Sequence, residues 1–168
     1  MSPQKHNHRS QKAVNDAPDW YLHPGDVSFR GVIFPWECDS MGHLSNKYYL
    51  GMFDQASWHV FLALGYRPVM AEREYVGLAD VHQTIDFHRE LRAGQLILVR
   101  SWLERVGEKS LTTHHDMLDA TENTVVATLE SVTTFFNLRE RKSISIPASI
   151  REVAMHWLRS RPLLNQAE

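Results

Sequence analysis

Residues 37–49 read Glu37-Cys38-Asp39-Ser40-Met41-Gly42-His43-Leu44-Ser45-Asn46-Lys47-Tyr48-Tyr49. A carboxylate, Asp39, stands at the centre of this polar loop, and a segment rich in apolar and aromatic side chains follows it. The apolar residues of that segment fall on several helical faces, which predicts a helix from about Asn46 to Leu64 that is covered on most sides. The sequence thus predicts a carboxylate close to the start of a buried helix.

Turn residues and periodicity predict the elements on either side of this helix. An apolar and aromatic run predicts a short strand at residues 29–36. Gly65 and Pro68 end the helix, because glycine is favoured just outside a helix C-terminus and proline beyond it. Alternation of period two then predicts strands at residues 76–88, 96–105, 110–119 and 124–137. Their short connections imply an antiparallel meander.

The C-terminal part of the chain predicts one more helix. Pro147 precedes a capping-box pattern, Ser149-Ile150-Arg151-Glu152, and Pro162 ends the segment. The order of elements predicts an α+β fold in which a bent antiparallel sheet of about five strands wraps a long central apolar helix, with a short C-terminal helix. Residues 20–168 are expected to form one domain, and the polar residues 1–19 a flexible N-terminal arm.

Composition limits the class of protein. A chain of 168 residues with 43% hydrophobic and 23% charged residues fits one globular domain. The net charge of -2 offers no basic field for a phosphate backbone, so nucleic-acid binding is not expected. The single cysteine, Cys38, excludes an intrachain disulfide, and no apolar run is long enough for a bilayer. We therefore expect a cytoplasmic protein with no membrane partner.

The loop resembles that of the hotdog-fold acyl-CoA thioesterases, specifically the 4-hydroxybenzoyl-CoA thioesterase-like group. Asp39 to Asn46 and the following Tyr49 match that group's Asp-x-x-Gly-His-Val-Asn-Asn loop and tyrosine. Ser45 stands where the common pattern has asparagine, whereas Asn46 keeps it. The resemblance covers about residues 29–150, and its further matches are Asp54, Gly107-Glu108-Lys109-Ser110 and Arg141-Lys142 ahead of Ile146-Pro147.

This resemblance implies hydrolysis of an acyl-CoA or acyl-carrier thioester to a free acid and a thiol. Asp39 is then the nucleophile or the general base, and a carboxylate is suited to either role. Asn46 would supply an oxyanion donor through its backbone N–H, at the positive end of the helix dipole. His43 is the third catalytic candidate. No metal and no cofactor are expected, apart from the coenzyme A of the substrate.

Five residues are candidates for substrate binding: Gly42, Tyr49, Asp54, Lys109 and Ser110. Gly42 permits close approach of the loop backbone. Asp54 has apolar helical neighbours, so we expect it to be buried and either to orient the substrate or to pair across a subunit interface. The resemblance makes the turn at Lys109 a contact for the nucleotide phosphates of coenzyme A.

Each of these assignments has a structural alternative. For Asp39 the alternative is a turn or capping residue before the helix, and for His43 it is a histidine that fixes the loop by hydrogen bonds. Cys38 is better explained as a small buried residue than as a nucleophile. His114 and His115 are adjacent, so on a strand they point to opposite faces and cannot easily share a metal ion.

Two other functions remain open on the same fold. One is a non-catalytic module that binds acyl thioesters, and the other is a hydratase or dehydratase. The resemblance also implies a homodimer or homotetramer whose sheets join edge to edge, because a sheet wrapped on one helix leaves an edge strand open. The acyl group itself is not specified by the sequence.

Overall fold

The computed structural model describes residues 22–23 and 25–159. The predicted N-terminal arm at residues 1–19 and the predicted helix end at Pro162 lie outside them. The elements in chain order are β1 (Val27–Val32), the 3-10 turn η1 (Pro35–Glu37), α2 (Asn46–Ala63), α3 (Pro68–Arg73), β2 (Val76–Phe87), β3 (Leu96–Val106), β4 (Ser110–Asp119), β5 (Thr124–Asn137), β6 (Lys142–Ser143) and α4 (Ala148–Arg159).

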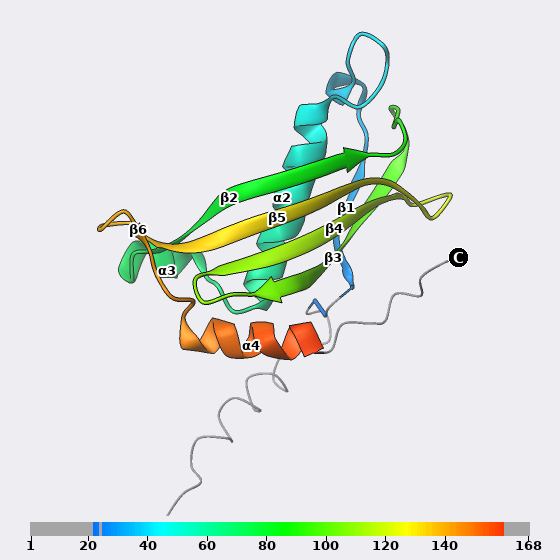
Figure 1. The fold of residues 1–168 in the computed structure, drawn as a ribbon. Helices are drawn as coiled ribbons and strands as arrows, with labels where there is room; N and C mark the ends of the chain where they lie inside the picture. Colours follow the sequence, from blue (N-terminus) through cyan, green and yellow to red (C-terminus); the bar gives the residue numbers. More distant parts are fainter. Residues whose placement is uncertain (1–21, 24, 160–168) are drawn as a thin grey trace, which may run out of the picture.

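One antiparallel sheet curls around helix α2 (Figure 1). The strand order is β1-β3-β4-β5-β2, and the two-residue strand β6 pairs with β5. Helix α2 packs against β1, β3 and β4, and α4 packs against β3 at one end of the sheet. The predicted α+β architecture, with a long helix, five long strands and a short C-terminal helix, is confirmed.

The predicted meander of four consecutive strands is wrong for its first member. Strands β3, β4 and β5 follow one another through short turns, but β2 pairs with β5. Strand β1 occupies the edge of β3, from Val32 opposite Leu96 to Val27 opposite Arg100. Strand β4 pairs with one edge of β5, and β2 pairs with the other edge.

Two predicted boundaries also differ. The first strand ends at Val32, because Pro35 has no N–H for a ladder and begins the turn η1, where Phe34 stacks on Trp36 in contact with solvent. Helix α4 begins at Ala148, so Ser149 lies inside the first turn and does not cap it; the N–H of Arg151 donates to the Pro147 carbonyl instead. The short helix α3, which Pro68 begins, was not predicted.

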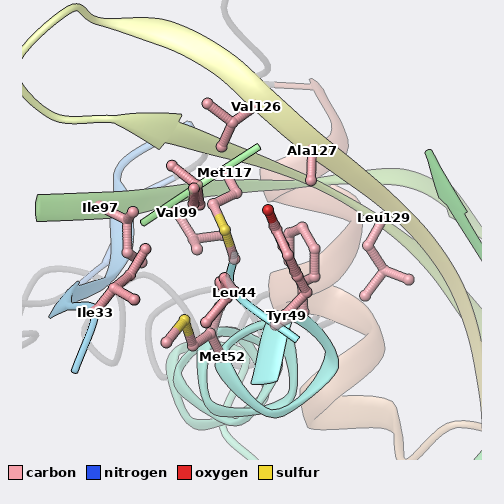
Figure 2. Packing of buried hydrophobic residues seen from close by; sticks show 13 residues of the cluster. Ile33, Leu44, Tyr49, Met52, Ile97, Val99, Met117, Val126, Ala127 and Leu129 are labelled. Atoms are coloured by element: carbon pink, nitrogen blue, oxygen red, sulfur yellow. The ribbon is translucent and has the colours of Figure 1, made fainter. Parts of the chain in front are cut away.

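The core has two parts, one on each half of α2. The half nearer the Asp39 loop packs against β3, β4 and β5, and Figure 2 shows side chains of the loop and helix facing those of the sheet. Members of this cluster are Ile33, Leu44, Tyr49, Met52, Phe53, Ala56, Leu91, Ile97, Val99, Met117, Val126, Ala127 and Leu129. The second cluster joins the end of α2 to α4 and is centred on Val60, Leu64, Phe135 and Ile150.

The expectation that α2 is covered on most sides is wrong for this chain. Its buried residues lie on one face, whereas Leu50, Trp58 and Leu62 are 40%, 48% and 36% exposed. The helix does carry apolar side chains on several faces, as predicted. A single sheet covers only one side of it, so the apolar side chains on the other side stay exposed. In the part of the chain that the structure describes, no helix has the length and apolarity needed to cross a membrane.

Candidate functional site

A tight loop between η1 and α2 holds Asp39. The backbone N–H groups of Met41 and His43 donate to Asp39 Oδ1 at 2.8 and 3.2 Å, and the Asp39 N–H donates to the His43 carbonyl at 2.8 Å. Gly42 has a φ of 80°, a conformation that suits glycine far better than other residues. The loop therefore closes on the Asp39 side chain itself.

These bonds favour the ionised form of the carboxylate. The backbone N–H of His43, then that of Met41, hold the pKa of Asp39 below its ordinary value, and the nearby His43 ring acts in the same direction. Donors to an ionised carboxylate stabilise its charged form. Asp39 is exposed, so it stays ionised and accessible at neutral pH.

An open cavity of about 290 Å³ adjoins this loop. It is lined by Asp39, Met41, His43 and Leu44 of the loop, Asn46 and Tyr49 of α2, and Phe87, His88, Arg89 and Glu90 at and beyond the end of β2. The structure thus brings four of the predicted site residues, Asp39, His43, Asn46 and Tyr49, to one cavity, while Gly42 shapes the loop beside it.

The start of α2 contributes hydrogen-bond donors to this region. Ser45, the N-cap residue, makes no side-chain capping bond, and its N–H donates to the Glu37 carbonyl. The Tyr48 N–H donates to the Ser45 carbonyl. Among the described residues, the N–H groups of Asn46 and Lys47 have no acceptor. Free N–H groups in a first helical turn form a ready site for negative charge.

Tyr49 of α2 is one of the residues that line the cavity. Its side chain is 3% exposed and its ring meets Phe87 edge to face, with the ring centroids 5.1 Å apart. Burial, chiefly, raises the pKa of the Tyr49 hydroxyl, and the negative charge of Glu90 adds to it. The hydroxyl is therefore neutral at physiological pH and points from α2 toward the sheet (Figure 2).

Sequence reasoning missed residues 87–90 as part of the site. Phe87 and His88 end a predicted strand and Arg89 and Glu90 follow it, without any motif of their own. What brings them to the loop is long-range contact, because the Leu44 N–H donates to the Leu91 carbonyl at 2.7 Å and His43 Nε2 lies 3.0 Å from Glu90 Oε2. The signal in the sequence was limited to the proximity of His88 and Glu90 to a strand end.

Three predicted site residues lie away from the cavity. Asp54 is exposed, which corrects the expectation that it is buried; its pKa is raised first by partial burial and then by the charge of Asp80. Lys109 and Ser110 lie at the far end of the sheet. Ser110 pairs with Thr134, which pairs with Ala79, about 26 Å along β2 from Phe87 at 3.3 Å per residue.

The fold and the loop together define an α+β protein in which a curled antiparallel sheet packs on a long helix, with Asp39 in the loop that leads into that helix. A family model described as the thioesterase-like superfamily matches residues 33–158, more than half of the chain. The protein therefore belongs to the thioesterase-like superfamily, and its fold is the predicted hotdog fold.

Solved structures share this fold at low sequence identity. SAV2348 from Staphylococcus aureus, solved in complex with CoA, has a TM-score of 0.79 and 16% identity over 88% of this chain and 93% of that chain. Slr0204 from Synechocystis, a 1,4-dihydroxy-2-naphthoyl-CoA thioesterase, has a TM-score of 0.68 and 16% identity over 76% and 93%. YbaW from Escherichia coli, a probable thioesterase, has a TM-score of 0.65 and 18% identity over 77% and 97%. No curated protein sequence matches significantly.

Proposed function

We propose that this protein hydrolyses an acyl thioester of coenzyme A, or of an acyl carrier, to a free acid and a thiol. The observation that supports it best is the meeting of Asp39 with the first turn of α2 at one cavity. A carboxylate and backbone donors are the two components that hydrolysis of a thioester requires. Membership of the thioesterase-like superfamily supports the same reaction.

Asp39 provides the attacking group in one of two ways. Its carboxylate adds to the thioester carbonyl, the thiolate leaves, and water then opens the mixed anhydride to regenerate the carboxylate. In the other route it takes a proton from a water molecule as that water adds to the carbonyl; the adduct then expels the thiolate as the C–S bond breaks, and the proton passes from Asp39 to the thiolate. Both routes use the ionised form, which the N–H groups of His43 and Met41 favour.

Asn46 supplies the second component. Its N–H and that of Lys47 lack acceptors among the described residues, and they lie at the positive end of the α2 dipole. Negative charge that develops on the thioester oxygen is stabilised by such donors. His43 helps by holding the loop through its backbone and by placing an imidazole beside the carboxylate.

Coenzyme A is the thiol that the similar proteins suggest. One of them was solved with CoA bound, and another is named as an acyl-CoA thioesterase. Lys109 and Ser110 of the same chain are too far from the cavity to hold the nucleotide end there, so we assign that role to their copies in a second subunit. The proposed assembly is a homodimer or homotetramer.

Asp39→Asn tests the mechanism with the least disturbance, because the amide keeps an oxygen for the N–H groups of Met41 and His43. We expect the variant to lower thiol release from a panel of acyl-CoAs by about 100- to 10,000-fold, the range for loss of a positioned base. Asp26→Asn, ahead of β1 and outside the residues that line the cavity, is the matched control and should retain full turnover.

Turnover by Asp39→Asn equal to that of the wild type would contradict the mechanism. Tight binding of an acyl-CoA by the wild type without any release of thiol would instead support the binding-module alternative. A conjugated enoyl product would indicate a hydratase or dehydratase.

A further inference from the structure

Glu90 is a residue of the cavity that the proposed mechanism leaves without a role. It follows β2, and its Oε2 lies 3.0 Å from His43 Nε2. The His43 side chain is 18% exposed and its Nε2 is buried, whereas the Glu90 side chain is 66% exposed. Among the described residues, Nε2 has no hydrogen bond of regular geometry, and the Glu90 carboxylate is a polar group in contact with it; burial of a polar atom favours such a contact.

The segment after β2 supports the loop at a second point. The Leu44 N–H donates to the Leu91 carbonyl at 2.7 Å, immediately beside the contact between His43 and Glu90. Two neighbouring residues of the loop are thus held by two neighbouring residues of another segment. The Leu44 bond belongs to the backbone, so Glu90 is the side chain of this pair that substitution can remove.

Two arginines lie near Glu90, and neither contacts its carboxylate as closely as His43 does. Arg89 lines the same cavity but donates from Nη1 to Glu122 Oε2 at 2.6 Å and to Thr124 Oγ1 at 3.1 Å. Arg92 Nη2 lies 3.9 Å from Glu90 Oε2, on an exposed side chain. Of His43 and Arg92, His43 lies nearer to the Glu90 carboxylate, at 3.0 Å against 3.9 Å for Arg92.

We propose that Glu90 is a positioning residue for the Asp39 loop, acting through the His43 side chain. The proposal rests on the proposed function. Glu90 fixes His43, and the backbone N–H of His43 is one of the two donors that hold Asp39 Oδ1. Removal of Glu90 therefore makes the position of the Asp39 carboxylate at the cavity less well defined, although the Asp39 side chain itself is unchanged.

Kinetics of Glu90→Ala and Glu90→Gln test this role, with Glu140→Ala in the distant turn after β5 as the control. We expect kcat of Glu90→Ala to fall by roughly 10- to 100-fold with little change in KM, because a displacement of about 1 Å at reacting groups can lower a rate 100-fold. Glu90→Gln, which keeps an oxygen near Nε2, should recover part of the loss. Glu140→Ala should behave as the wild type.

The pH profile separates positioning from general packing. The other titratable groups that line the cavity are His43, Tyr49, His88, Arg89 and Glu90. Backbone donors from His43 and Met41 depress the pKa of Asp39, so a loosened loop should move the acid limb of kcat to higher pH in Glu90→Ala. Unchanged kcat in Glu90→Ala, or a lower kcat with an unmoved acid limb, would overturn the proposal.

Amide hydrogen exchange gives a readout that does not need activity. Glu90→Ala should lose protection at the N–H groups of Met41, His43 and Leu44, and should add no further loss when combined with His43→Ala. Wild-type protection at these amides in Glu90→Ala would overturn the proposal. If the wild type releases no thiol, the proposed function fails while this measurement still decides whether Glu90 holds the loop.

Discussion

At the scale of single residues, the loop uses Asp39 as a turn residue and leaves its carboxylate at the cavity. The sequence left open whether Asp39 is a reactive carboxylate or a turn residue, and the geometry shows that it does form the turn, by accepting from Met41 and His43. The same bonds keep it ionised beside the cavity. The turn role of Asp39 is therefore compatible with the catalytic role that we propose for its carboxylate.

The adjacent histidines of β4 illustrate a residue-scale prediction that is confirmed. His114 stacks on Trp102 on one face of the sheet, with ring centroids 4.7 Å apart, whereas His115 lies fully buried on the other face near Phe53. Ser101 Oγ lies 2.6 Å from His115 Nδ1, and Thr113 Oγ1 and Ser57 Oγ lie 3.0 and 3.3 Å from Nε2. Hydroxyl groups thus satisfy both ring nitrogens in the core.

His115 should make the protein sensitive to acid. Burial, chiefly, lowers its pKa from 6.5 to about 3. The unfolded chain binds the proton at a higher pH than the folded chain, so stability is lost as pH falls from about 6.5 toward 3, by up to about 1.4 kcal/mol per pH unit.

Denaturant unfolding between pH 7 and 5 measures this effect. The free energy of unfolding of the wild type should fall by about 2 kcal/mol more over that range than that of His115→Asn. His59→Asn, at an exposed position of α2, is the control and should follow the wild type. Parallel curves for the wild type and His115→Asn would refute the assignment.

At the scale of elements, α2 connects the core to the site. Its buried face anchors both core clusters, and its first turn presents N–H groups next to the loop. Ser45 has an extended backbone, with φ -72° and ψ 142°, and Asn46 is the first helical residue. A proline at position 46 therefore fits both the helix start and the residue before it.

Asn46→Pro should remove the proposed oxyanion donor while keeping the helix. We expect kcat to fall by about 100- to 1,000-fold, as for loss of one such donor elsewhere, with little change in thermal stability. Asn46→Ala retains the N–H and loses only the side chain, so comparison of the two variants isolates the backbone donor. Equal turnover in the two variants would rule out the Asn46 N–H as the donor.

At the scale of the whole molecule, the edge of β2 and one face of α2 both expose apolar side chains. Strand β2 is an edge of the sheet, with Val81 61% exposed and its pairing with β5 shifted between Asp80 and His82. The uncovered face of α2 exposes Leu50 and Trp58. An unpaired strand edge with apolar side chains favours association with another copy of the chain.

Val81→Lys should weaken the proposed assembly, because a lysine on an edge strand opposes pairing with a second strand. Light scattering should give a dimer or larger species for the wild type and a shift toward monomer for Val81→Lys. Val69→Lys, at an exposed position of α3, should leave the assembly intact. A wild type that is monomeric at all working concentrations would contradict the proposed homo-oligomer.

What the sequence determined by itself is mostly local. The start of α2 at Asn46 and the spans of β4 and β5 agree with the residues predicted, because helical periodicity, strand alternation and turn glycines act between residues close in the chain. The loop motif similarly placed Asp39, His43 and Asn46 together, since all three lie within one short segment.

Only the tertiary structure decided how distant segments meet. Pairing of β2 with β5, the position of Glu90 beside His43 and the distance of Lys109 from the cavity all depend on which strand edges are free once β1 has paired with β3. Exposure of Asp54 has the same origin, because one sheet covers one face of α2 whatever the helix sequence offers on the other. Such contacts arise from burial and pairing across the whole chain, and no local pattern encodes them.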